Sequence, residues 1–208
     1  MAYNEFAYFY DEFNGEADYD ALYSQIHAKL KAHGIHDGIV ADLGCGTGEL
    51  TLMLTQAGYD MIGIDQSEEM LCVVRDKAEQ LGLSGRLLLL RQDLLKLDLY
   101  GTIDACVCCL DSINYVTRPK ALLRAFQRVH LFLMPGGLFL FDVNTPEKLE
   151  GLDGGMFIDE TDDTYCVWRA DYARRSRICT YGFDLFFRQD DGLWRREEEV
   201  HQERAYTP

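Results

Sequence analysis

Short apolar runs alternate with amphipathic segments along the first two thirds of the chain. Runs such as IVADL (residues 39–43) and MIGID (residues 61–65) are nearly continuous in apolar residues, as is typical of strands buried on both faces of a parallel sheet. Each run is followed by a segment whose apolar residues recur every three or four positions, which is the spacing of one helix face. The alternation predicts right-handed βαβ units and an α/β fold with a doubly wound, Rossmann-like, mostly parallel sheet.

Residues with special backbone preferences mark the ends of the predicted helices. An amphipathic helix is predicted over residues 18–33, before the first strand, and Gly34 ends it. Ser67 suits the N-cap of the helix after the second strand, and Pro119 suits the first turn of the helix after the fourth. The remaining strands are the runs RLLLLRQDL, IDACVCCLD and GLFLFDVNT (residues 86–94, 103–111 and 137–145).

The pattern changes after Asn144. Three strand-like segments rich in aromatic residues follow, at residues 164–172, 177–189 and 193–204. The Asp191-Gly192 pair favours a hairpin turn before the last of them. We therefore expect an inserted antiparallel three-stranded meander, in which the odd-numbered aromatic face of the middle segment is buried on the core or covers its ligand.

The charge balance narrows the class of partner. The 208 residues contain 20 Lys and Arg against 35 Asp and Glu, and the formal net charge is −15. A surface of this sign repels nucleic acid and anionic membranes, so we expect a small-molecule or cationic ligand. The N-terminus lacks the pattern of a signal peptide, and no apolar run reaches the roughly 18 residues of a membrane span, which predicts a cytoplasmic protein.

The cysteines do not indicate a metal site. Cys106 and Cys109 form a C-x-x-C, but both lie inside one apolar run, and no second pair or histidine cluster supplies the other ligands. The total of seven cysteines is also odd for a disulfide framework. We expect reduced, buried thiols and no metal.

The candidate chemistry lies at the ends of the first three strands. The stretch DLGCGTG (residues 42–48) follows the first strand, where doubly wound sheets bind ligands and where glycines permit a close approach of the backbone. Its G-x-G-x-G spacing differs from the G-x-G-x-x-G of dinucleotide enzymes. Asp65 ends the second strand, where a carboxylate can accept both ribose hydroxyls, and Asp93 follows the third, where it can accept from an exocyclic amine.

With this combination the sequence resembles the class I S-adenosylmethionine-dependent methyltransferases. The resemblance covers about residues 17–144 and is greatest to the small-molecule branch, including sugar-amine and glycine N-methyltransferases. It implies a cofactor-binding Rossmann-like core with an N-terminal helical lead-in at residues 1–147, and an antiparallel insertion or lid at residues 148–208. It also implies the cofactor, S-adenosylmethionine.

The resemblance assigns residues to the methionine end of the cofactor. Gly44, Cys45 and Gly46 would lie against the methionine part, and Asp42 would shape that loop. The backbone at Cys109 and Leu110 would meet the α-amino group. The N-terminal Tyr10, with other tyrosines near it, would close over the cofactor.

The resemblance also assigns residues to the adenosine end. Asp65 would bind the ribose, and Gln66 and Met70 would flank the adenine. Asp93 and the Leu94 backbone would bind its amino edge. Structural alternatives stay open, because Asp42 and Asp65 could serve only as turn or helix-cap residues, and a shift of register could put another aspartate in the place of Asp93.

Methyl transfer from a sulfonium is an in-line displacement in which positioning supplies most of the acceleration. A base is needed only when a protonated amine or a hydroxyl accepts the methyl group. Asp111, after the fourth strand, and His201, in the last segment, are the candidate catalytic groups, although a solvated structural role for His201 is as plausible. The sequence lacks the N-P-P-Y and Pro-Cys motifs of DNA methyltransferases, which favours a small-molecule acceptor, plausibly an amine.

Two other functions share these features. A protein could bind S-adenosylmethionine without turnover, and a nicotinamide-dependent oxidoreductase could use the glycine loop and Asp65.

The family sheet has seven strands, whereas this chain stops after the inserted strands. Either the inserted strands supply substitute edge strands, or the form is C-terminally shortened and lacks the final two core strands. We expect the shortened form, whose open sheet edge a partner or a second copy in a homodimer would cover.

Overall fold

The computed structural model describes residues 17–189 and 191–207, which form two compact units. The first unit contains the described residues up to 113 together with residues 119–142, and the second contains residues 114–118 and the described residues from 143 onward. No sequence signal marked segment 114–118 as part of the second unit. Among the described residues, no helix is long and apolar enough to cross a membrane.

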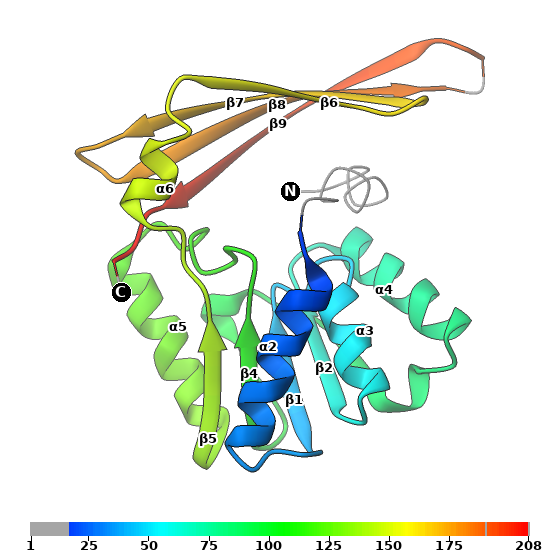
Figure 1. Ribbon diagram of the computed structural model, residues 1–208, viewed down its shortest axis with the longest axis vertical. Coiled ribbons are helices and arrows are strands. Elements are labelled where there is room, and N and C mark those ends of the chain that lie inside the picture. Colours follow the sequence, from blue (N-terminus) through cyan, green and yellow to red (C-terminus); the bar gives the residue numbers. More distant parts are fainter. Residues whose placement is uncertain (1–16, 190, 208) are drawn as a thin grey trace. The chain divides into compact units, whose positions relative to one another are not determined.

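The first unit is built on a five-stranded parallel sheet with the order β3-β2-β1-β4-β5, most of which is labelled in Figure 1. The predicted parallel α/β sheet is thereby confirmed. The strands are β1 Ile39–Leu43, β2 Asp60–Asp65, β3 Leu87–Arg91, β4 Ile103–Cys108 and β5 Leu133–Phe141. β5 begins before the expected Gly137, and its register with β4 shifts between Ile103 and Ala105.

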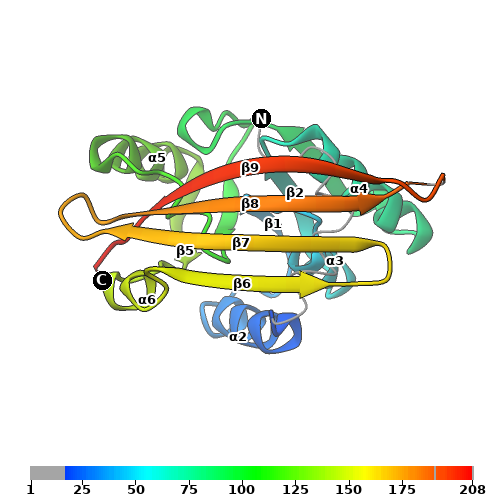
Figure 2. The same cartoon turned by 90° about the horizontal axis from the view of Figure 1, so that it is seen from above.

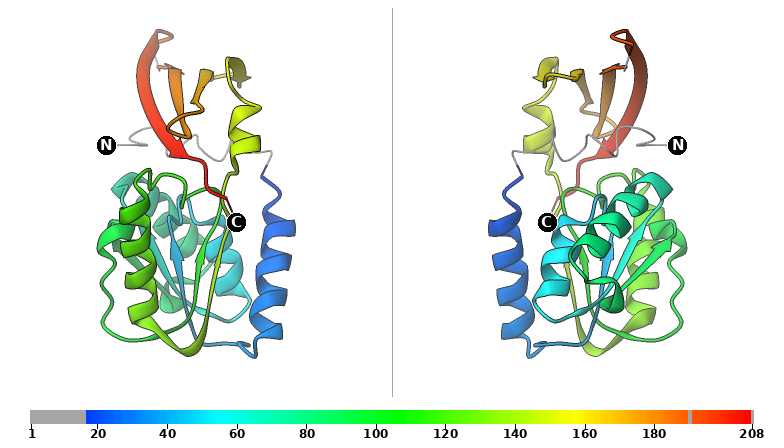
Figure 3. Two further views of the ribbon diagram at one scale, coloured as in Figure 1. Left: turned by 90° about the vertical axis from the view of Figure 1, so that its left-hand side faces the viewer. Right: turned by 90° about the vertical axis from the view of Figure 1, so that its right-hand side faces the viewer.

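Helices connect the strands of this sheet. They are α2 Tyr19–Ala32, α3 Glu49–Gln56, α4 Glu68–Gln80 and α5 Pro119–Phe132, with short 3-10 helices η2 Ser84–Arg86 and η3 Leu94–Lys96. α2 and α5 lie on opposite faces of the sheet (Figure 3). Because both faces are covered, the central strand β1 is buried from Val40 to Leu43.

The core of the first unit explains the apolar periodicities. Leu30 of α2, Leu54 of α3 and Val107 of β4 are fully buried in one cluster with Val40. Tyr59 is also fully buried, and its hydroxyl donates to the Ile35 carbonyl at 3.1 Å. The buried polar tip therefore has a partner, as burial of a hydroxyl requires.

The strand order reverses beside β1, because β2 follows it on one side and β4 lies on the other. In doubly wound sheets such a reversal opens a crevice outside the carboxyl ends of the strands. Residues 44–48 follow β1 at this position. The fold thus places the glycine loop where the sequence pattern predicted a ligand.

The second unit contains a four-stranded antiparallel sheet with the order β6-β7-β8-β9 (Figure 2). Its elements are α6 Pro146–Glu150, β6 Gly155–Glu160, β7 Thr164–Ala173, β8 Ile178–Arg188 and β9 Trp194–Arg204. The predicted strand count of three was wrong because β6 was missed. Its adjacent apolar residues Met156, Phe157 and Ile158 are all exposed and show no alternation.

The predicted inner face of the middle strand is confirmed. Cys179, Tyr181, Leu185 and Phe187 of β8 are buried, while residues between them are more exposed. Tyr181 and Cys179 pack in a cluster with Leu149 of α6. The period-two pattern therefore reported a real burial difference between the faces of this sheet.

Candidate active site

Glycines shape the loop after β1 by adopting left-handed backbone conformations. Gly44 has φ +71° and Gly46 has φ +53°. A Cβ atom on Gly44 would lie 2.4 Å from the Ser112 hydroxyl, so only glycine fits there. The Gly44 and Cys45 amides both donate to the Ile64 carbonyl of β2, at 2.8 and 3.1 Å, which ties the loop to the neighbouring strand.

Asp65 lies against this loop, as the sequence analysis predicted for the end of β2. One carboxylate oxygen accepts from the Gly46 amide at 3.0 Å, and the other accepts from the Ser67 amide at 2.9 Å. Burial raises the pKa of Asp65, and the hydrogen bonds from the backbone oppose that shift. Two loops therefore meet at a single carboxylate.

Asp42 is buried beneath the same loop. It accepts a hydrogen bond from the Thr51 hydroxyl of α3 at 2.6 Å. Burial raises the pKa of Asp42 to about 6; the Thr51 bond opposes the shift and the charge of Asp65 adds to it. Asp42 thus joins the end of β1 to the following helix, a contact compatible with the loop-shaping role predicted for it.

The start of α4 carries the next predicted residues. Ser67 caps the helix, because its hydroxyl accepts from the Met70 amide at 3.2 Å. Met70 is buried, whereas Gln66 is exposed and its carbonyl accepts from Arg91 at 3.1 Å. The structure brings Gln66 next to Asp65, and the adenine-flanking roles of Gln66 and Met70 stay predictions.

Asp93 follows β3 and caps a short helix. Its carboxylate accepts from the Leu95 amide at 2.8 Å, and Leu94 is the first residue of η3. The other aspartate of this stretch, Asp98, is exposed and pairs with Arg128 at 3.1 Å. Asp93 therefore lies just after β3, as predicted. It also caps η3, a contact that the sequence did not predict.

The turn after β4 holds two non-glycine residues in the left-handed region, Leu110 at φ +53° and Asp111 at φ +59°. Both amides donate to one carboxylate, that of Asp142 at the end of β5, at 2.8 and 2.9 Å. This turn carries the predicted Cys109 and Leu110 positions. The sequence analysis missed Asp142, although an acidic residue directly after an apolar strand is the same signal that identified Asp65.

The two candidate catalytic groups fall in different units. Asp111 belongs to the first unit and His201 to the second. The alternative of a solvated structural role for His201 is wrong, because this residue is 5% exposed in β9 and its Nε2 lies 2.8 Å from Glu199. Its catalytic role stays a prediction. The Tyr115 ring meets it edge-on at 6.0 Å. Tyr10 lies outside the described residues.

Cys106 and Cys109 are buried in the first unit. Burial raises the pKa of Cys106 and Cys109, so these thiols stay protonated rather than forming metal-binding thiolates.

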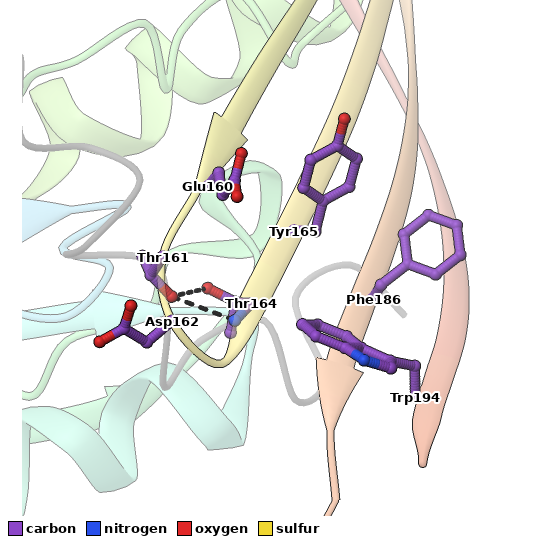
Figure 4. A pocket seen from close by; sticks show the side chains of 7 residues that line it. All are labelled: Glu160, Thr161, Asp162, Thr164, Tyr165, Phe186 and Trp194. Carbon is purple, nitrogen blue, oxygen red and sulfur yellow. Dashed lines mark hydrogen bonds between the residues drawn. The ribbon is translucent and has the colours of Figure 1, made fainter. Parts of the chain in front are cut away.

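An open hollow of about 500 Å³ lies at the β6–β7 turn of the second unit, where the Thr161 and Thr164 hydroxyls are 2.6 Å apart (Figure 4). None of the predicted site residues lines this hollow.

Comparison with known proteins identifies the family. The methyltransferase domain family matches residues 40–137. Over 208 residues the chain is 31% identical to a protein of Geobacillus sp. (strain WCH70) and 33% identical to YqeM of Bacillus subtilis (strain 168), both named provisionally as methyltransferases. These alignments cover 99% of this chain and 83% and 81% of the two relatives.

A solved structure agrees with this match over nearly the whole chain. The S-adenosylmethionine-dependent methyltransferase from Clostridium acetobutylicum ATCC 824 superposes with a TM-score of 0.85 at 31% identity, covering 99% of this chain and 82% of that one. This chain belongs to the S-adenosylmethionine-dependent methyltransferases. Its membership favours methyl transfer over the hydride transfer of an oxidoreductase, and it makes S-adenosylmethionine the cofactor.

More distant structures share the fold of this methyltransferase. The sugar N-methyltransferase KedS8 from Streptoalloteichus sp. ATCC 53650 has a TM-score of 0.78 at 21% identity, covering 95% of this chain and 78% of its own. At this level of identity the likeness concerns the fold alone.

The glycine loop of this methyltransferase fits its cofactor. Gly46 has a positive φ, and the position that a Cβ would take has no atom within 4 Å, so the loop presents open backbone there. The Asp65 carboxylate, which suits ribose hydroxyls, lies at the amide of that same glycine. An open backbone beside a strand-end carboxylate is compatible with an adenosine-containing ligand.

Proposed function

We propose that this methyltransferase transfers the methyl group of S-adenosylmethionine to a small-molecule amine. The observation that carries the proposal is the Asp65 carboxylate, which is joined to the glycine loop through the Gly46 amide at 3.0 Å. The excess of carboxylates, with a formal net charge of −15, supports a cationic acceptor over an anionic one.

The cofactor would be held by the strand-end residues of the first unit. Asp65 would accept from the ribose hydroxyls, while Gln66, Met70, Asp93 and Leu94 would surround the adenine. The loop from Asp42 to Gly46 and the turn at Cys109 and Leu110 would hold the methionine part. This list extends the sequence assignment with one residue, Asp142, which would keep the turn in place.

The bound cofactor supplies a methyl group activated on a sulfonium. The protein's own contribution is then to position the acceptor, to exclude water and to take up one proton when a protonated amine is the acceptor. Asp111 and His201 are the proposed proton acceptors. A thioether leaving group needs no proton, so no general acid is required.

Titration calorimetry with S-adenosylmethionine tests the cofactor site. We expect micromolar affinity for the unchanged protein and loss of detectable binding in Asp65→Ala, because the loop and the ribose would both lose their acceptor. Asp60→Ala is the matched control, since Asp60 begins the same strand and its side chain is 57% exposed. Equal affinity of Asp65→Ala and the control would sink the assignment of this site.

An acceptor screen tests the amine. Formation of S-adenosylhomocysteine is measured with pairs of small molecules that differ only in an amino or a hydroxyl group. We expect turnover with amines and none with their hydroxyl partners. Turnover of hydroxyl compounds alone would remove the amine from the proposal and leave the methyltransferase activity.

The homodimer stays a prediction, which gel filtration tests.

A further inference from the structure

The hollow at the β6–β7 turn lies on the more exposed face of the second sheet. Strand pairing places Tyr165 of β7 opposite Glu160 of β6 and opposite Phe186 of β8, so these three side chains share one face. The buried face is the other one, where Cys166 and Leu185 are each 1% exposed. The hollow is therefore open to solvent and is not part of the core of this sheet.

Three aromatic side chains form one side of the hollow. Figure 4 shows Tyr165, Phe186 and Trp194 on that side, and the threonine and acidic side chains of the turn on the other. The Tyr165 and Phe186 rings lie 6.2 Å apart and are inclined by 61° to each other. Trp194 of β9 is 49% exposed, so a ligand can reach its indole ring.

Two carboxylates belong to the opposite side. Glu160 ends β6, Asp162 lies in the turn that follows, and both residues are exposed. Within residues 17–189 and 191–207, neither carboxylate accepts a hydrogen bond or pairs with a basic group. The hollow therefore has two acceptor groups that the described part of the chain does not use.

The basic side chains on this part of the face have other partners. Arg188, which pairs with Trp194 in the sheet, lies 3.8 Å from Asp163. Arg196, which pairs with Phe186, donates to Asp184 at 3.1 Å. Neither arginine is among the residues that line the hollow. The lining therefore carries a negative charge that these arginines do not neutralise.

The turn itself is held in a defined shape. The Thr161 and Thr164 hydroxyls are 2.6 Å apart, and the Thr161 hydroxyl also accepts from the Thr164 amide at 3.1 Å. The hollow has a volume of about 500 Å³. This volume lies within the range of about 300–1,000 Å³ that small-molecule sites occupy.

We propose that this hollow binds a small organic ammonium ion, with its positive group between the two carboxylates and the three rings. Carboxylates attract a cation by charge, and the faces of aromatic rings attract it through their quadrupole, most strongly for tryptophan. A metal ion instead needs several oxygen ligands around one point. No group of three side chains suited to a metal exists among the described residues, which favours the organic cation.

This site goes beyond the proposed function, because it shares no residue with the cofactor site. All the residues that line the hollow belong to the second unit, whereas the glycine loop and Asp65 belong to the first. Ammonium binding and cofactor binding can therefore be measured separately.

Nuclear magnetic resonance provides the direct test. The chain has two tryptophans, so Trp194→Phe assigns both indole N–H signals. The probes are choline and 3,3-dimethylbutan-1-ol, which has the same shape but carbon in place of the charged nitrogen, at matched ionic strength. We expect choline to shift the Trp194 signal saturably and the Trp168 signal little, with an affinity at least fivefold higher than that of the neutral alcohol.

Neutral substitutions test the charge recognition. The double variant Glu160→Gln, Asp162→Asn is expected to weaken choline binding at least threefold and to leave binding of the alcohol unchanged. Asp171→Asn is the matched control, because Asp171 is an exposed carboxylate on the same face of β7, near the other end of that strand from Tyr165. It should leave the affinity for choline unchanged.

Each outcome decides the proposal. Equal affinities for choline and the alcohol, or equal effects of the double variant and Asp171→Asn, would overturn it. A shift confined to the Trp168 signal would also overturn it, because that ring lies on the opposite face. Choline binding that persists in Asp65→Ala, with loss of S-adenosylmethionine binding, would support a separate site, whereas loss of both would contradict it.

Discussion

The two sheets of this methyltransferase hold their carboxylates in different ways. In the parallel sheet they lie at strand ends and accept from backbone amides, as Asp65 does from Gly46 and Ser67. In the antiparallel sheet they lie along a strand and contact other side chains, as Glu199 contacts His201. A backbone amide is placed by the fold of its loop, whereas a side-chain donor also depends on its own rotamer.

This difference concerns rigidity. A carboxylate held by backbone amides is pre-organised by the fold of its loop. A pair of side chains forms only when both rotamers are held, which costs side-chain entropy. Substitutions that change backbone-linked groups should therefore have the larger effects, and four predictions test this in order of expected size.

The largest effect is expected for a side chain of the second unit that hydrogen-bonds to backbone groups, unlike the side-chain pairs of its sheet. Asn114 is fully buried; its amide donates to the Asn144 and Arg204 carbonyls, at 3.0 and 2.8 Å, and its side-chain oxygen accepts from the Asn144 amide at 2.9 Å. Asn114→Ala leaves several buried backbone groups without this partner, so we expect about 3–4 kcal/mol of destabilisation in urea unfolding.

The control for this prediction is another amide side chain of the second unit. Gln202 is exposed, and its contact with Thr180 is 3.3 Å long. Gln202→Ala should lower the free energy of unfolding by less than about 1 kcal/mol. A loss below about 1 kcal/mol for Asn114→Ala as well would show that segment 114–118 contributes little to the second unit.

Asp42 gives the second prediction, which depends on pH. Burial raises the pKa of Asp42 from its ordinary value of 3.8 to about 6 in the folded protein, so the folded state holds the proton more tightly. Its contribution to stability is therefore complete below about pH 4 and is lost as the pH rises through 6. Asp42→Asn should raise stability at pH 8 by about 1–3 kcal/mol.

Thermal unfolding from pH 4 to pH 8 checks this sign. The gain from Asp42→Asn should shrink as the pH falls, because the folded wild-type carboxyl takes up its proton as the pH passes below about 6. Asp60→Asn, at an exposed position of the first unit, should show no such trend. A variant that is less stable than the wild type at pH 8 would contradict the assigned cost of the buried charge.

Asp142 tests the importance of the left-handed turn. An asparagine at this position keeps one acceptor oxygen and directs an N–H₂ group at the second amide, so one of the two hydrogen bonds to Leu110 and Asp111 is lost. On the proposed function, Asp142→Asn should raise the KM for S-adenosylmethionine about tenfold, equivalent to about 1.4 kcal/mol.

Steady-state kinetics distinguish a positioning role from loss of folding. A positioning role predicts a raised KM with a smaller change in kcat at saturating cofactor, whereas partial unfolding lowers kcat in proportion to the folded fraction. Asp98→Asn is the control, since this exposed carboxylate pairs only at the surface with Arg128. Identical kinetics of the two variants would remove Asp142 from the cofactor site.

The smallest effect is expected on the outer face of the antiparallel sheet. Arg169 lies 3.1 Å from Asp184 and is about half exposed. Exposed ion pairs contribute little because water and salt screen them, so Arg169→Gln should cost less than about 1 kcal/mol. Urea unfolding at low and high salt checks this, and the difference should vanish at high salt. A loss as large as that for Asn114→Ala would break the ranking.

The sequence predicted the parallel sheet, the glycine loop after β1 and the position of Asp65 at the end of β2. Apolar runs, cap residues and strand-end aspartates are local signals, and the Gly46 amide does lie against Asp65 as their order implied. β6 could not be predicted because its exposed apolar residues show no alternation, and its stability depends on pairing with β7. A solvated role for His201 stayed open in the sequence because periodicity indicates a face but not its burial, and the structure buries this residue.

The sequence by itself determined the family, the glycine loop and the aspartates after the first three strands, because each depends on residue type within a few positions. Tertiary structure alone decided which distant groups meet. Asp142 holds a turn more than thirty residues earlier in the chain, and strand pairing sets Phe157, Trp168 and Phe183 side by side from three different strands. Such contacts follow from strand order and register, which are set when whole elements pack together.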